Sequence, residues 1–111
     1  RVRTERGTLF TTRCEAIFNE HPRVYRSALV GIGEPGKQLP VMIVEPWPEQ
    51  RPSDDADERA LLDELQEMGK KSDVTSSIKH FLVHPNLPVD IRHNAKIFRE
   101  ELAVWAANRL T

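Results

Sequence analysis

Two apolar segments joined by a short turn constrain the fold of this chain more than any other feature. The first, residues 23–32, reads RVYRSALVGI, and the second, residues 39–47, reads LPVMIVEPW. The intervening segment GEPGKQ is rich in the residues that form turns. We therefore expect two strands paired as a hairpin, the second mostly buried because its apolar run is almost continuous.

Three segments around this hairpin have the spacing of helices. In residues 11–22, Cys14, Ile17 and Phe18 share one face and Pro22 ends the pattern. Residues 56–69 end in Gly69, which we expect to be a C-cap. A last helix is expected from about Ala95 to Leu110. The apolar stripes are Leu61, Leu62, Leu65 and Met68 in the second helix and Phe98, Leu102, Trp105 and Ala106 in the third.

A further strand is expected over residues 78–83, followed by a loop over residues 86–94 and preceded by the second helix. A small strand before the first helix is also compatible with the sequence. The resulting order is helix, strand, strand, helix, strand, helix. This order predicts one α+β domain over residues 1–111, with about three helices packed on a small sheet.

Composition excludes several classes of protein. Lys and Arg total 16 and Asp and Glu total 17, and this balance argues against a general nucleic-acid binder. No apolar run is long enough to cross a bilayer. The single cysteine, Cys14, rules out an internal disulfide and fits a reducing compartment, so we expect a cytoplasmic location.

Two motifs suggest ligand sites but have simpler interpretations. Gly31, Gly33 and Gly36 match G-x-G-x-x-G, yet dinucleotide binding needs a helix to follow, and here a strand is expected. A hairpin turn is the favoured interpretation. His80 and His84 are spaced i, i+4, but zinc needs three or four converging ligands. We therefore expect ordinary histidines and no metal site.

Two side chains of the first helix raise the question of a role in chemistry. Cys14 could be a nucleophile, but its apolar helix face favours a small core residue. Glu15 could be a functional carboxylate, or it could form a capping box with Thr12. The capping box is the favoured interpretation, because it needs only local spacing.

Lys96 is the most unusual charged residue of the chain. If Asn94 is the N-cap of the last helix, Lys96 occupies the second helical position. The helix macrodipole disfavours a cation there by ~0.3–1 kcal/mol, while the free N–H groups of the same end attract anions. Lys96 is then either a group that meets an external anion such as a phosphate, or a surface lysine that tolerates a small penalty.

The chain resembles the small C-terminal domain of adenylate-forming enzymes, the superfamily of acyl-CoA synthetases, luciferases and peptide-synthetase adenylation domains. The resemblance lies in TRCEAIFNEHPRVYRSALVGIG, PVMIVE and NAKIFREEL. In NAKIFREEL, Lys96 matches the catalytic lysine of the family, although Ala95 replaces the usual glycine and Pro88 lies two residues further away than usual. Gly7 is one residue off the usual spacing, and Arg13 stands where an acid is common.

The resemblance implies that residues 1–111 form the mobile lid domain of an AMP-forming ligase. A large N-terminal adenylation domain and the hinge residue before Arg1 would lie outside this chain. Lys96 would stabilise charge as ATP and a fatty acid form an acyl-adenylate. Gly7 and Thr8 would belong to the face that closes the site for the second half-reaction. The enzyme would need ATP and Mg2+, and the chain alone would be inactive.

Two products and one rival class remain open. VDIRHNAKIFREELAVWA and CEAIFNEHPRV are most similar to a branch of fatty-acid–CoA ligases that includes the β-lactone synthetase of bacterial olefin biosynthesis. Coenzyme A would give an acyl-CoA, whereas the hydroxyl of a β-hydroxy acid would give a β-lactone without coenzyme A. The rival is a stand-alone, non-enzymatic binding or dimerisation module. The lid interpretation predicts an exposed Lys96 at a tip.

Overall fold

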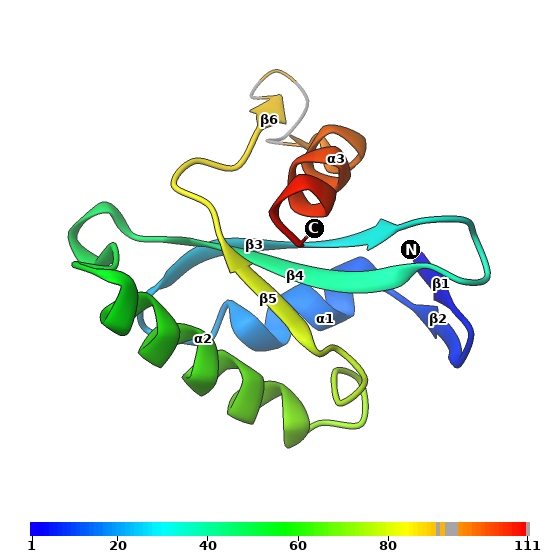
Figure 1. The fold of residues 1–111 in the computed structure, drawn as a ribbon, viewed down its shortest axis with the longest axis horizontal. Coiled ribbons are helices and arrows are strands. Elements are labelled where there is room, and N and C mark those ends of the chain that lie inside the picture. Colours follow the sequence, from blue (N-terminus) through cyan, green and yellow to red (C-terminus); the bar gives the residue numbers. More distant parts are fainter. Residues whose placement is uncertain (91, 93–95, 111) are drawn as a thin grey trace.

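The computed structural model describes residues 1–90, 92 and 96–110, in which a three-stranded sheet lies between helices on its two faces (Figure 1). The elements are β1 (Val2–Thr4), β2 (Gly7–Leu9), α1 (Thr11–Phe18), β3 (Val24–Ile32), β4 (Leu39–Pro46), a 3-10 turn (Pro48–Gln50), α2 (Asp55–Lys70), β5 (His80–Val83), β6 (Val89–Asp90), β7 (Lys96–Ile97) and α3 (Arg99–Leu110). This is the predicted α+β class.

The predicted hairpin is the centre of the sheet. Strands β3 and β4 pair antiparallel with Leu29 opposite Met42, and β5 joins β4 in parallel. The strand order is β3-β4-β5, which leaves β3 at one edge. Strand β5 begins at His80 rather than at the predicted Ile78, because the N–H of Ile78 is bonded to the carbonyl of Thr75 in a turn.

The glycine motif forms the turn of this hairpin, as predicted. Gly33 and Gly36 have φ values of 104° and 96°, a region that favours glycine. The N–H groups of Gly36 and Gln38 both donate to the carbonyl oxygen of Arg3, at 3.0 and 2.9 Å. The turn is therefore fixed on β1, and strand β4 follows it.

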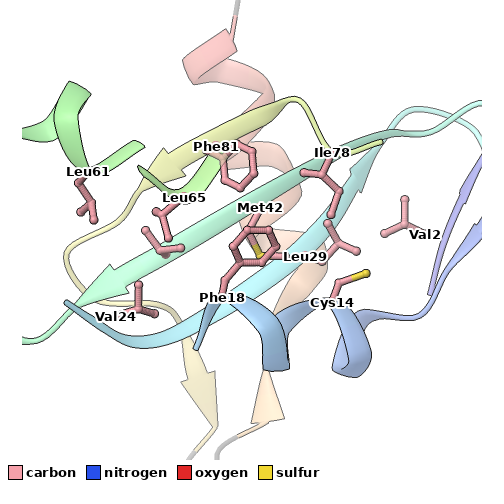
Figure 2. Close-up of a cluster of buried hydrophobic side chains, with 11 residues drawn as sticks. Val2, Cys14, Phe18, Val24, Leu29, Met42, Leu61, Leu65, Ile78 and Phe81 are labelled. Atoms are coloured by element: carbon pink, nitrogen blue, oxygen red, sulfur yellow. The ribbon is translucent and has the colours of Figure 1, made fainter. Parts of the chain in front are cut away.

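One face of the sheet is covered by α1 and α2, and Figure 2 shows the buried side chains between them. Phe18 of α1 meets Phe81 of β5 edge to face, with ring centroids 5.3 Å apart. Gly69 is not the C-cap that was predicted, because α2 continues to Lys70 and is capped at Lys71. A Cβ at Gly69 would lie 3.0 Å from Cζ of Phe18, so glycine here permits close packing of α2 on α1.

The opposite face is covered by α3 (Figure 1). Leu102 and Ala106 of α3 are buried there, and Leu87 inserts from the segment after β5. The buried cluster consists of Ala28, Val30, Val41, Ile43, Leu87, Leu102 and Ala106. No helix among the described residues combines the length and apolar character that a membrane span requires.

The predicted capping box is wrong. Helix α1 begins at Thr11, its N-cap is Phe10, and no side chain caps it. Glu15 instead lies buried on α1, where its carboxylate binds groups of β3 and α3. The spacing of Thr12 and Glu15 suggested a local bond, but tertiary partners use the carboxylate.

Candidate active-site hairpin around Lys96

Lys96 lies in a short β-hairpin and not in a helix. Strand β7 pairs antiparallel with β6, placing Lys96 opposite Asp90 and Ile97 opposite Val89. The N–H of Phe98 donates to the carbonyl of Pro88 at 3.0 Å, which keeps the chain extended up to the start of α3 at Arg99. The prediction that Lys96 occupies the second position of a helix is therefore wrong. The argument that a helix macrodipole disfavours its charge does not apply to it. The predicted N-cap, Asn94, lies outside the described residues.

Lys96 is nevertheless exposed, as the lid interpretation predicts. Its hairpin stands away from the sheet beside α3 (Figure 1). Within the described part of the chain, Lys96 takes part in no ion pair. Ile97 is half-buried and packs against the cluster under α3, so the strand is anchored while its lysine faces outward.

A pocket of about 540 Å³ adjoins Lys96. Among the described residues, its lining forms one continuous segment, Lys96 to Glu101. It combines two cations, Lys96 and Arg99, with the ring of Phe98, which is 43% exposed, and the acidic first turn of α3. A second surface is needed to enclose a substrate here, because a single segment cannot surround one.

Each end of the hairpin segment meets a buried carboxylate. Glu45, at the end of β4, accepts the N–H of Leu87 at 2.8 Å and Nε of Arg26 at 2.7 Å. Glu15 accepts Nη2 of Arg99 at 2.7 Å with Oε2 and at 2.9 Å with Oε1. These two carboxylates therefore connect the segment that carries Lys96 to the body of the domain.

Sequence reasoning missed these connections. Glu45 ends the apolar run VMIVE, and Glu15 lies between Cys14 and the apolar pair Ile17 and Phe18. A carboxylate within an apolar surface needs a partner, so both positions signalled a buried interaction. Their partners could not be read from spacing, because Glu15 and Arg99 are 84 residues apart.

Gly7 and Thr8 lie on a different hairpin, formed by β1 and β2. Both are exposed, and Gly7 has a φ of 131°. They line a pocket of about 460 Å³ together with Arg6, Arg13 and the segment around Ser76. The structure does not bring them together with Lys96, and the two hairpins leave the sheet in different directions (Figure 1).

Two of the histidines, His84 and His21, serve in packing and pairing. His84 packs its ring against Trp105, with centroids 4.5 Å apart, and burial lowers the pKa of its imidazole. His21 Nε2 lies 2.9 Å from Oε1 of Glu64. No group of three potential metal ligands converges among residues 1–90, 92 and 96–110, a range that excludes His93. Cys14 is a core residue, as predicted, and burial raises the pKa of its thiol.

Comparison with known sequences finds close relatives, although no protein-family model matches the chain. The chain is 49% identical over 109 residues to olefin β-lactone synthetase from Xanthomonas campestris pv. campestris, covering 98% of this chain and 19% of that protein. It is 47% identical over 110 residues to olefin β-lactone synthetase from Stenotrophomonas maltophilia (strain K279a), covering 99% and 19%. The chain thus spans about a fifth of the length of these curated relatives.

Solved structures show the same fold at lower identity. The anthranilate CoA ligase AuaEII in complex with anthranoyl-AMP matches with a TM-score of 0.74 and 20% identity, over 95% of this chain and 19% of that one. The amide bond synthetase McbA from Marinactinospora thermotolerans matches with a TM-score of 0.68 and 18% identity, over 94% and 19%. In sequence the chain is therefore related to one part of the olefin β-lactone synthetases, and in fold it matches a domain of the adenylate-forming ligases.

Proposed function

We propose that this chain is the C-terminal lid domain of an AMP-forming ligase and that Lys96 is its catalytic lysine. The observation that carries the proposal is the exposed Lys96 on a hairpin that stands away from a well-packed domain. The similarity of nearly the whole chain to one-fifth of a synthetase supports a role within a longer enzyme. It also speaks against the rival interpretation, a stand-alone binding or dimerisation module.

The first half-reaction joins a carboxylate to the α-phosphate of ATP. A carboxylate oxygen bonds to the α-phosphorus, and the bond from that phosphorus to the bridging oxygen breaks, so pyrophosphate leaves with the electron pair. The ammonium of Lys96, placed by its hairpin beside these groups, would offset the negative charge of the transition state and hold the two anionic reactants together. Mg2+, which accompanies ATP, would be bound by the N-terminal adenylation domain, because the described residues offer no converging ligand set.

The proposed substrate is a β-hydroxy fatty acid and the proposed product a β-lactone. The names of the curated relatives support this choice over an acyl-CoA. In the second step the β-hydroxyl oxygen bonds to the carbonyl carbon, AMP leaves with its electron pair, and the hydroxyl proton is released. Gly7 and Thr8 would lie on the face that closes the site for this step, after the domain has rotated. The location proposed is the cytoplasm, where ATP is available and Cys14 stays reduced.

The test uses the full-length enzyme that carries this domain, as wild type, Lys96→Ala and the control Lys70→Ala. Each receives ATP, Mg2+ and a β-hydroxy fatty acid, with and without coenzyme A, and mass spectrometry follows AMP and the product. We expect Lys96→Ala to lower the rate of AMP formation about 100-fold or more, as loss of a preorganised charge does. Lys70 is exposed at the far end of α2, so Lys70→Ala should match wild type.

The products then separate the two outcomes. A β-lactone formed without coenzyme A would support the proposed product. A thioester formed only with coenzyme A would show instead that the enzyme is an acyl-CoA ligase. AMP formation by Lys96→Ala at the wild-type rate would show that Lys96 is only a surface residue. The isolated 111-residue chain should not turn over ATP, since it supplies a single cation to the reaction.

A further inference from the structure

The segment that carries Lys96 leaves the body of the domain at Leu87 and returns at Arg99. Near Leu87 the attachment is Glu45, which is only 6% exposed. One oxygen of its carboxylate accepts both the N–H of Leu87 and Nε of Arg26. Arg26 lies opposite Glu45 across the β3–β4 pairing, so the first end of the segment is bound to the centre of the sheet.

The attachment near Arg99 is Glu15, which is 8% exposed. Its Oε2 accepts the N–H of Leu29 at 2.8 Å, and both of its oxygens accept from Nη2 of Arg99. Because β3 is an edge strand, the N–H of Leu29 points to a side where no neighbouring strand lies within the described sheet. Glu15 therefore joins three elements at the edge of the sheet: α1, β3 and the first residue of α3.

This arrangement limits the movement of Arg99. If Arg99 moved away, the buried carboxylate of Glu15 would keep the N–H of Leu29 but lose the positive charge that offsets its burial, so displacement of Arg99 is opposed. A charge-assisted contact to both oxygens also restricts direction as well as distance. Only Ile97 and Phe98 separate Lys96 from Arg99 in the chain, so a displacement of Arg99 would also displace Lys96.

We propose that Glu15 is a positioning residue for adenylation: through Arg99 it holds the Lys96 hairpin at the orientation the reaction needs, while Glu45 holds the other end. This inference rests on the proposed function of Lys96. It adds that the rate of adenylation depends on a buried carboxylate of α1, a helix on the opposite face of the sheet from α3. Glu15 itself touches no reacting group.

The test is a double-mutant cycle in the full-length enzyme between Glu15→Gln and Lys96→Ala, read by the rate of pyrophosphate release, which reports adenylation directly. Glutamine keeps an acceptor for the N–H of Leu29 and removes the charge that holds Arg99. We expect Glu15→Gln to lower the rate about 10- to 100-fold, the size of effect that misplacing a reacting group by ~1 Å produces. In the Lys96→Ala background the same change should have no further effect, because Glu15 acts only through Lys96.

Two controls separate positioning from general stability. Glu64→Gln removes a carboxylate of α2 that contacts His21, on the other face of the sheet from α3, and should leave the rate at the wild-type value. Conversion of acyl-adenylate supplied to the enzyme should be unchanged in Glu15→Gln, since Lys96 serves the first half-reaction.

A further variant, Arg99→Lys, keeps the charge but loses the planar guanidinium, and should lower adenylation less than Glu15→Gln. If Glu15→Gln does not fold, Arg99→Lys takes its place in the cycle.

The outcomes separate this inference from the proposed function. If Lys96→Ala lowers adenylation but Glu15→Gln does not, the inference is wrong and the proposed function stands. Equal losses from Glu15→Gln with and without Lys96, or an equal loss in both half-reactions, would show a structural role only and overturn the inference. If Lys96→Ala has no effect, the proposed function fails and the positioning role fails with it.

Discussion

The two faces of the sheet differ in what they bury and in what they carry. The face under α1 and α2 buries large side chains, including the aromatic pair Phe18 and Phe81 (Figure 2). The face under α3 includes small residues such as Ala28 and Ala106, and it is beside this face that the Lys96 hairpin stands. The difference teaches that the larger core and the candidate catalytic group are on opposite sides of one sheet, so stability and activity can be changed separately.

The largest expected effects come from removing one buried leucine on each face. Leu65→Ala and Leu102→Ala should each lower the free energy of unfolding by about 2–5 kcal/mol, because both side chains are fully buried. Urea unfolding of the 111-residue chain measures this loss. Only Leu102→Ala should also lower adenylation by the full-length enzyme at temperatures where both variants are folded, since α3 supports the hairpin. Equal activity losses in both variants would contradict the separation of the two faces.

A smaller effect is expected at Gly69, where α2 passes close to α1. In Gly69→Ala the new methyl group would lie 3.0 Å from Cζ of Phe18, whose ring is held against Phe81. Overpacking costs ~1–3 kcal/mol and the better helix propensity of alanine returns ~1 kcal/mol, so we expect a net loss of roughly 1 kcal/mol. The control Asp63→Ala, on the exposed side of α2, should stay within about 0.5 kcal/mol of wild type. A more stable Gly69→Ala variant would mean that the Phe18 ring can move aside.

The smallest effect is a pH dependence on the α3 face. Burial lowers the pKa of His84, and Arg109 acts in the same direction, while Glu45 and Glu101 oppose them. The unfolded chain therefore binds the proton more readily than the folded one. The stability that neutral His84 contributes is complete above its unfolded pKa of about 6.5 and is lost as the pH falls through the folded pKa. Between pH 7 and 5, wild type should lose more stability in urea unfolding than His84→Gln; parallel pH curves would refute this.

The sequence predicts the central hairpin, α2 and β5 well because each has a strong local pattern. The strands from Val24 to Ile32 and from Leu39 to Pro46 begin and end within a residue of their expected bounds. The composition of the segment GEPGKQ predicted their turn. Such elements need no knowledge of distant residues, since composition and alternation already select them.

The site was predicted less well, because its geometry depends on pairing between distant residues. Lys96 looked helical from the apolar spacing that follows it, yet it pairs with Asp90 in a strand of two residues, too short to show a pattern. Glu15 satisfied the spacing of a capping box, but its partners are Leu29 and Arg99. Two reasons favoured Lys96: a supposed place at a helix start, which the structure contradicts, and a match to a family motif, with which its exposure agrees.

The carboxylate of Glu15 also bears on how this chain behaves beside other copies of itself. An edge strand offers unpaired N–H and C=O groups to which another strand can add. On β3, Glu15 occupies the N–H of Leu29, and the hydroxyl of Ser27 donates to Asn19 at 2.7 Å, so α1 covers this part of the edge. Helix α1 thereby shields this part of the sheet from intermolecular strand addition. Under the proposed positioning role, one carboxylate would serve both the placement of Lys96 and resistance to aggregation.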